Sequence, residues 1–336
     1  MSQIGYMGVD IFFVISGYIM WYSTQHTHGL KGILEFIYAR LTRIYPLYWS
    51  FLFLLILLYW GKKQLENADI VSSFLLTTSS LGDMLLPVAW TLQYELYFYL
   101  FFALLLAIPR KYQIKMLFIA LFVIVTVQLY AILFLDIYNK EHFYTVSRLY
   151  LFWFSPIVIE FFLGVFVAYF FEYARIRYLT PIVVLILLLL ISALYYQNYK
   201  IVGSLEQGYY TPQRVLFLGT LSMLLVACMV ELNKREIRIL PKIANSLGNA
   251  SYSLYLSHTI LLYLAYKTGV RNTIEDLDGY HEVGMFLIIG IIIVYTLFHY
   301  KYIELPLLKL SKHMRQKLFY TSKHTHKYKN VKNIDN

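Results

Sequence analysis

Five ionisable residues that could carry chemistry lie within otherwise apolar stretches of the sequence. They are Asp10, Glu95, Glu160, His258 and Glu304. An ionisable side chain at the centre of a lipid bilayer costs about 2.5–3.5 kcal/mol, so each one needs a reason to be there if these stretches cross a membrane. Carboxyl groups and imidazoles accept and donate protons, so the pattern favours acid–base catalysis or proton coupling.

Asp10 and Glu95 are the candidate catalytic acids. From the topology derived below, both are expected a similar distance below the outer surface, where they could face one cavity and relay protons. His258, near the middle of its apolar stretch, is the candidate base, although a packing hydrogen bond explains it at least as well. Glu160 also has two interpretations, proton chemistry or a hydrogen bond between helices.

Two arginines three residues apart form a candidate site for a phosphate-bearing ligand. Arg40 and Arg43 precede an apolar stretch. At this spacing both guanidinium groups share one helix face and could bind phosphate oxygens through paired N–H donors. Tyr38, Tyr45 and Trp49 lie close by in the sequence and would suit a nucleotide-bearing ligand. The simpler interpretation is that the arginines anchor the chain at the cytoplasmic membrane surface.

The composition indicates which elements must position these residues. Of the 336 residues, 59% are hydrophobic and 14% are charged, which is outside the range of soluble globular domains. The net charge of +10 is spread between apolar stretches and over the C-terminal tail, so nucleic-acid binding is not expected. With Cys228 as the single cysteine, a disulfide and a metal–thiolate cluster are excluded. The His26/His28 and His324/His326 pairs lack convergent ligands, and no metal site is predicted.

Nine apolar runs approach the ~20 residues with which a helix crosses a hydrocarbon layer of ~30 Å. They cover residues 5–22, 44–60, 88–108, 116–136, 150–171, 179–196, 214–231, 250–266 and 284–301. The stretch 68–86 is rich in Ser and Thr and is predicted to be an outer loop or a re-entrant segment. The predicted fold class is therefore all-α, a polytopic integral membrane protein with about nine transmembrane helices.

The basic residues set the predicted orientation, because positively charged loops stay in the cytoplasm. Of the 29 Lys and Arg residues, 21 lie in alternate connections and in the tail that begins at Lys301. The C-terminus is therefore predicted to be cytoplasmic and the N-terminus to face outward. Residues 1–310 are predicted to form the transmembrane domain, and 311–336 a basic, disordered cytoplasmic tail near anionic lipid headgroups.

Six strings of residues together resemble, in order, the membrane-bound acyltransferase-3 family. They are Gly8–Tyr18, Arg40–Trp49, Trp90–Tyr99, Glu160–Gly164, Leu247–His258 and Tyr302–Pro306. The resemblance covers residues 4–310, nearly the whole chain. Within the family, the chain looks most like the enzymes that O-acetylate sugars of exopolysaccharide or lipopolysaccharide.

This resemblance implies a helical domain of about ten spans in the bacterial inner membrane. It implies acetyl-CoA, or another acyl-CoA, as the cytoplasmic donor and a hydroxyl group of a lipid-linked or exported glycan as the acceptor, without a metal. By position, Arg40 and Arg43 match the family's donor-associated Arg-x-x-Arg motif. Asp10 and Glu95 match acids of two further family motifs.

The chain departs from the family pattern at its start. Family members begin with one more helix, which carries an Arg and, about ten residues later, a His regarded as the catalytic base. Two explanations stay open, a true start that lies upstream of Met1 or a shortened, inactive relative. In the chain as given, His258 or a carboxylate such as Asp10 or Glu95 would have to supply the base.

A rival interpretation is a proton-coupled transporter or glycan flippase, because buried acids and histidines also serve proton coupling. The sequence does not settle the acceptor sugar, the acyl chain, the oligomeric state, or the choice between direct transfer and an acyl-enzyme.

Overall fold

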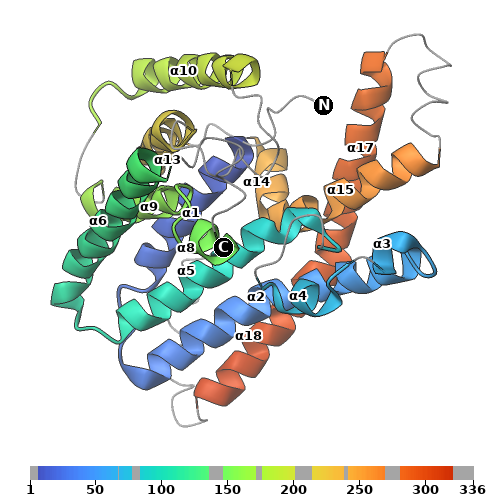
Figure 1. Ribbon diagram of the computed structural model, residues 1–336, viewed down its shortest axis with the longest axis horizontal. Helices are drawn as coiled ribbons and strands as arrows, with labels where there is room; N and C mark the ends of the chain where they lie inside the picture. Colours follow the sequence, from blue (N-terminus) through green and yellow to red (C-terminus); the bar gives the residue numbers. More distant parts are fainter. Residues whose placement is uncertain are drawn as a thin grey trace. The chain divides into compact units, whose positions relative to one another are not determined.

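All regular elements that the computed structural model describes are helices, which confirms the all-α fold class (Figure 1). The described residues are 7–66, 68–77, 84–135, 147–171, 176–200, 214–237, 241–268 and 281–320. The chain forms two compact units, each made of two separate segments. Unit 1 comprises Met1–His28 and Leu100–Ile239, and unit 2 comprises Gly29–Tyr99 and Leu240–Asn336.

Six helical segments are long and apolar enough to cross a membrane, which fits a polytopic membrane protein. They are Gly29–Leu58, Pro87–Leu106, Arg110–Phe134, Leu149–Phe170, Val215–Lys234 and Phe286–Phe319. Each overlaps one of the nine predicted runs. The other three runs also coincide with helices, α1 (Met7–Ser23), α10 (Leu179–Lys200) and α15 (Ser251–Lys267), of which α1 and α15 have only 17 residues.

Unit 1 is built around a close contact between α1 and α9 (Val158–Phe170). A Cβ atom placed on Gly17 would lie 2.0 Å from the carbonyl oxygen of Phe161, and one on Gly164 would lie 1.9 Å from that of Val14. Because lipid provides no hydrophobic force between apolar helices, such small residues let two backbones approach and pack tightly. This contact brings α1, which carries Asp10, against α9.

The remaining described helices of unit 1 are the end of α5 (Trp90–Leu106), α6 (Arg110–Phe134), α8 (Arg148–Trp153), α10 and α13 (Thr220–Lys234), the last preceded by the π-helical turn η4 (Val215–Gly219). Of these, α6 and α13 pack against the α1–α9 pair, and α10 packs against α13. Between α10 and α13, Cys228 is buried in an apolar cluster with Ile186 and Leu190. The thiol therefore belongs to the core packing of the unit.

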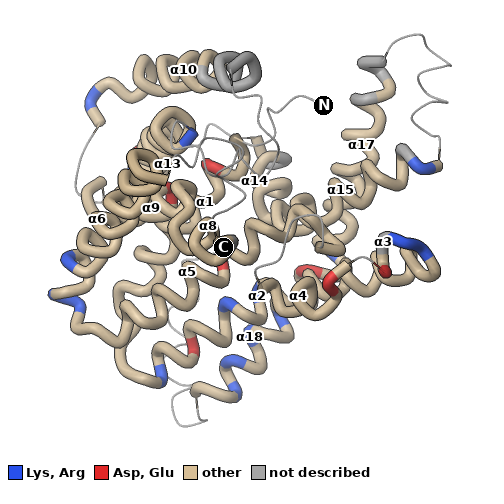
Figure 2. Tube along the Cα trace, in the orientation of Figure 1, with Lys and Arg blue, Asp and Glu red and all other residues tan. Residues whose placement is uncertain are grey.

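Unit 2 contains α2 (Gly29–Leu58), a helix of 30 residues that is continuous through Pro46. The stretch 23–43 was predicted to be a connection, and this prediction is wrong for residues 29–43, which form the first half of α2. The reason is tertiary, because α18 (Leu305–Phe319) runs alongside α2 and pairs with its polar side chains (Figure 1). Charged positions gather along these two helices, whereas the middle stretches of α6, α9 and α13 are mostly uncharged (Figure 2).

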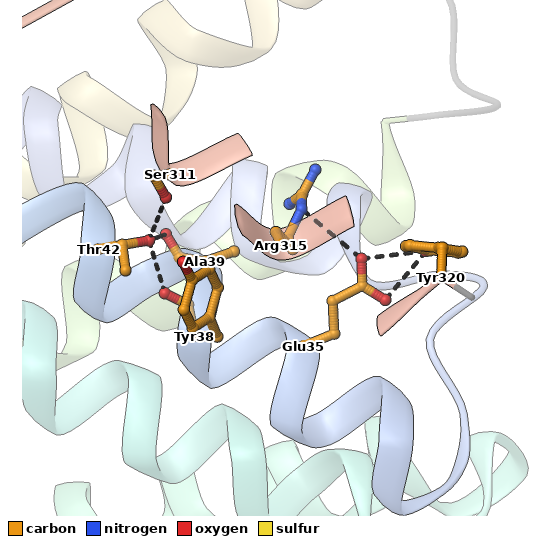
Figure 3. Close-up of polar contacts among 7 residues, drawn as sticks. All are labelled: Glu35, Tyr38, Ala39, Thr42, Ser311, Arg315 and Tyr320. Carbon is orange, nitrogen blue, oxygen red and sulfur yellow. Dashed lines mark hydrogen bonds and ion pairs between the residues drawn. The ribbon is translucent and has the colours of Figure 1, made fainter. Parts of the chain in front are cut away.

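Polar contacts connect α2 to α18 near the ends of both helices (Figure 3). The Ser311 hydroxyl donates to Thr42 Oγ1 at 2.6 Å. Glu35 accepts hydrogen bonds of 3.0 Å from the Tyr320 hydroxyl and lies 3.7 Å from Arg315 Nε. Residues 311–319, predicted as the start of a disordered tail, thus continue a packed helix, while residues 321–336 lie outside the described part of the chain.

The remaining described elements of unit 2 are short helices and the last apolar helices. They are α3 (Lys63–Glu66), α4 (Ile70–Leu75), η3 (Pro87–Ala89), the first part of α5, α14 (Lys242–Asn249), α15, α17 (His281–His299) and the π-helical turn η5 (Tyr300–Glu304). In the Ser- and Thr-rich stretch, α4 is capped by Asp69, whose side chain accepts from Ser72 N–H at 3.0 Å. Residues 78–83 of that stretch lie outside the described residues.

Candidate active site

Arg40 and Arg43 project from α2 and have different neighbours in unit 2. The Arg40 guanidinium carbon lies 5.4 Å from the ring centre of Phe36 and 5.6 Å from that of Tyr99 on α5. Both distances are within the range of cation–π attraction. Arg40 therefore lies against two aromatic rings, which orient its guanidinium group.

Arg43 pairs with a carboxylate and remains partly open. Its Nη1 lies 3.3 Å from Glu304 Oε1, and its guanidinium carbon lies 5.7 Å from the ring centre of Tyr252. The Tyr252 hydroxyl donates to the Ile44 carbonyl at 3.0 Å, which fixes that ring against α2. The Arg43 side chain is 38% exposed, so part of the guanidinium is accessible to a ligand.

The aromatic residues that the sequence pairs with these arginines have other roles. The Tyr45 hydroxyl and the Trp49 indole N–H donate to the carbonyl oxygens of Leu75 and Phe74, each at 3.0 Å. The ring of Tyr38 packs on Phe319 of α18, with centroids 5.9 Å apart. The aromatic neighbours of the arginine pair are instead Phe36, Tyr99 and Tyr252, which come from three different helices.

Glu95 belongs to the same group of residues. It is buried on α5, one turn before Tyr99, to which it is hydrogen-bonded, and it is also an electrostatic neighbour of Tyr252. Tyr99 and Tyr252 thus link Glu95 to Arg40 and Arg43. Three of the five predicted site residues meet in unit 2, and they combine an acid with two cations.

Asp10 lies in unit 1, so the cavity predicted to be shared by Asp10 and Glu95 stays a prediction. The fully buried Asp10 carboxylate accepts from Arg214 Nε at 2.8 Å and from Arg214 Nη2 at 2.9 Å. This fork-to-fork geometry is the strongest form of ion pair between side chains. Arg214 was not predicted as a partner of Asp10, because it is the first residue of the predicted run 214–231 and no sequence pattern connects it to Asp10.

Glu160 completes a buried charged cluster in unit 1. It is fully buried beside Asp10 and Arg214, and its Cγ would lie 3.0 Å from a Cβ atom on Gly219 in the π-helical turn. Within the described part of the chain, neither Glu160 carboxylate oxygen has a hydrogen-bond partner. Two acids and one guanidinium group therefore lie close together, which fits either a packing or a proton-handling role.

His258 on α15 contacts its own helix. Its Nδ1 lies 3.1 Å from the Leu254 carbonyl oxygen, and its ring lies beside that of Tyr255, 5.8 Å away. A second histidine, His299 at the end of α17, reaches another polar group, because its Nδ1 lies 2.9 Å from the Ser253 hydroxyl oxygen. The sequence analysis missed His299 because it falls at the end of the last apolar run.

Among the described residues, no group of three or more His, Cys, Asp or Glu side chains could hold a metal ion. His324 and His326 lie outside those residues.

Comparisons with known proteins agree with the resemblance carried by the six strings. Residues 1–299 match the acyltransferase-3 family, described as an acyltransferase domain. The chain is also 29% identical over 284 residues to "Exopolysaccharide production protein ExoZ" of Rhizobium meliloti (strain 1021), and the alignment covers 80% of each protein. No solved structure matches the chain.

Proposed function

Since the chain belongs to the acyltransferase-3 family of membrane acyltransferases, we propose that it moves an acetyl or other short acyl group from acyl-CoA to a hydroxyl group of an exported or cell-surface polysaccharide. A polysaccharide acceptor is supported by the similarity to ExoZ, whose name refers to exopolysaccharide production. Acetyl-CoA as donor is the expectation that follows from the family resemblance.

The observation that carries the donor assignment is the pair Arg40 and Arg43 on one face of α2. Guanidinium groups bind phosphate oxygens through paired N–H donors, and the CoA moiety supplies several phosphates. Arg43 is partly accessible, and Arg40 lies against two aromatic rings that orient its guanidinium group. The accessible part of the Arg43 guanidinium group favours an anionic ligand over a purely structural role.

In the proposed reaction, a base takes the proton of a glycan hydroxyl as its oxygen attacks the thioester carbonyl. The CoA thiolate leaves and receives a proton, which balances the step. Tyr99 and Tyr252 link Glu95 to the arginine pair, which supports Glu95 as the proton acceptor. His258 and Asp10 stay candidates for the same role, and the bidentate contact of Asp10 with Arg214 favours a positioning role for Asp10.

The donor site is proposed to face the cytoplasm, where acyl-CoA is available. The helix α18, which packs against the first half of α2, carries Lys309, Lys312 and Lys317 on exposed positions, as expected for a cytoplasmic end. A reporter fused after Phe319 should therefore be active only as a cytoplasmic fusion. An active periplasmic reporter at this position would contradict the proposed orientation.

The function is tested by transfer of a labelled acetyl group from acetyl-CoA to glycan in membranes that contain the full chain. We expect the Arg40→Ala, Arg43→Ala double variant to lose at least about 100-fold in donor affinity, because each charge-assisted contact contributes about 1.5–3 kcal/mol. The matched control is Arg315→Ala, which removes an arginine from the same helix pair but lies beside Glu35. Transfer by the double variant at the control's rate would show that the donor binds elsewhere.

A second candidate function is proton-coupled transport or flipping of a glycan. The buried Asp10–Arg214–Glu160 cluster favours it, because membrane-embedded acids of this kind also couple proton movement to transport. Proton-dependent glycan uptake into proteoliposomes that contain the chain but no acyl-CoA would support this alternative. Transfer that requires acyl-CoA, without such uptake, would exclude it.

A further inference from the structure

We propose that Glu304 is a positioning residue for the acyl donor: held in place by Ser253, it aims the guanidinium group of Arg43 at the phosphates of CoA. This inference rests on the proposed function, in which Arg43 contacts the donor. It concerns one of the five ionisable residues of the apolar stretches, to which the sequence assigned no role of its own.

The two oxygens of Glu304 are used differently. Oε2 accepts from the Ser253 hydroxyl at 2.6 Å and from the Ser253 backbone N–H at 3.2 Å. Oε1 is buried, and its described contact is the 3.3 Å approach of Arg43 Nη1. One edge of the carboxylate is thus anchored to α15, while the other edge is directed at the arginine.

The anchor is itself supported by the π-helical turn η5. This turn begins directly after His299 and ends at Glu304. A π-helical turn contains more residues than an α-helical turn, and here it brings the side chains of His299 and Glu304 to the same partner, Ser253. The His299 ring is packed against the ring of Phe51, with centroids 4.9 Å apart. π-helical turns inside α-helices are frequent at functional sites, because they redirect side chains that a regular helix would separate.

The geometry at Arg43 leaves room for a ligand. A guanidinium group has five N–H donors, and the contact with Glu304 involves one terminal nitrogen. Tyr252 lies against the group from the side of α15, and the arginine side chain is 38% exposed. Glu304 thereby fixes the orientation of the Arg43 guanidinium group, while other N–H groups of Arg43 stay accessible to phosphate oxygens.

A purely structural role is the alternative, because Glu304 and Arg43 also connect the C-terminal helices to α2. The same helix pair contains a matched contact of this kind, Glu35 with Arg315 and Tyr320 (Figure 3). If both contacts only hold the helices together, substitutions at Glu35 and at Glu304 should lower the stability of the protein by similar amounts. A positioning residue would change donor binding at Glu304 alone.

The experiment measures KM and kcat with acetyl-CoA for the full chain in lipid nanodiscs. In Glu304→Gln, an amide oxygen can still accept from Ser253, but an NH₂ group then faces Arg43. We expect KM to rise about tenfold, equivalent to about 1.4 kcal/mol, with kcat changed by less than about twofold. Ser253→Ala should raise KM about threefold, because the backbone N–H still holds Glu304.

Glu35→Gln and Ser257→Ala are the matched controls. Ser257 lies one turn after Ser253 on α15, and its hydroxyl contacts only its own helix, at the Leu254 carbonyl, among the described residues. Both controls should keep the wild-type KM. If Glu304→Gln does not fold, the comparison of Ser253→Ala with Ser257→Ala decides the question.

Binding of CoA, measured by calorimetry, separates this inference from the donor assignment. If Arg43→Ala weakens CoA binding while Glu304→Gln and Ser253→Ala keep the wild-type KM, the inference is overturned and the donor site stands. A lower KM in Glu304→Gln would also overturn it, since Glu304 would then compete with the phosphates. Wild-type CoA binding by Arg43→Ala would refute the donor site and the inference together.

Discussion

Arg214 in unit 1 and Arg43 in unit 2 both pair with a carboxylate on another helix, but the two contacts differ in geometry and exposure. Arg214 is 2% exposed and contacts both oxygens of Asp10 at 2.8 and 2.9 Å. Arg43 is 38% exposed and contacts one oxygen of Glu304 at 3.3 Å. The Arg214 guanidinium group uses two nitrogens to bind its carboxylate and is buried, whereas the Arg43 guanidinium group uses one nitrogen and is partly exposed.

This difference indicates different roles. Removing one member of a buried ion pair leaves an uncompensated charge in an apolar interior, at a cost of about 3–5 kcal/mol. The Arg43–Glu304 pair is only half open, since Arg43 is 38% exposed and Glu304 is buried, so breaking it should cost less than breaking the fully buried pair, and the exposed part of Arg43 is available for a ligand. The unit 1 cluster is thus suited to hold helices together, and the unit 2 pair to bind an anion.

The largest expected effect is on folding, in Arg214→Ala. This change leaves Asp10 and Glu160 buried without their cation and should destabilise the protein by about 3–5 kcal/mol. Arg43→Ala should cost less, about 1–2 kcal/mol, because the buried Glu304 loses its contact with Arg43 but keeps its two bonds from Ser253. Thermal unfolding of the purified variants in detergent measures both.

A second variant checks the cause of that loss. Removing both charges, in Asp10→Asn with Arg214→Gln, should recover part of the stability that Arg214→Ala loses. Equal losses of stability in Arg214→Ala and Arg43→Ala would contradict the different roles inferred for the two arginines.

The next effect tests the helix contact that positions Asp10. Gly17→Ala would place a Cβ atom 2.0 Å from the Phe161 carbonyl oxygen, so α1 and α9 must separate, at a cost of about 1–3 kcal/mol. Gly8→Ala, on the same helix, is the control, because no atom lies within 4 Å of its Cβ position. Thermal unfolding should shift in Gly17→Ala alone, and similar shifts in both would argue against a tight α1–α9 contact.

A charge-conserving change sharpens the role of Arg43. Lysine keeps the positive charge but lacks the planar fork, so Arg43→Lys should weaken CoA binding about tenfold, or about 1.4 kcal/mol. Arg315→Lys is the control on α18. Calorimetric titration with CoA gives the comparison. An unchanged affinity in Arg43→Lys would show that the positive charge at this position is sufficient and that the planar guanidinium geometry contributes nothing.

The smallest expected change in stability comes from two tyrosines of unit 2 that each donate one hydrogen bond but differ in burial. The buried Tyr48 hydroxyl donates to the Ser73 carbonyl at 2.6 Å, and the more exposed Tyr45 hydroxyl donates to Leu75. Tyr48→Phe should cost about 1 kcal/mol, because it leaves a buried acceptor unsatisfied, and Tyr45→Phe should cost less. Equal losses on thermal unfolding would favour bond number over burial.

Much of the fold was predictable, because the apolar runs have the length that a bilayer demands. The boundary of α2 was not, since its first half has the polar composition of a loop and is helical beside α18. The roles of Tyr45 and Trp49 were also missed. Their closeness to the arginines in sequence suggested ligand contacts, whereas their hydrogen bonds run to the segment at Phe74 and Leu75.

The membrane class, the helical fold, the family and the placement of Arg40 and Arg43 on one helix face can all be read from the residues alone. They depend on local quantities, namely run length, spacing and short strings. The pairing of Asp10 with Arg214, which lies 204 residues away, and of Arg43 with Glu304 became visible in the folded structure. In helices apolar on every side, no periodic pattern marks the face that packs, so the partners of buried charges emerge only when the helices assemble.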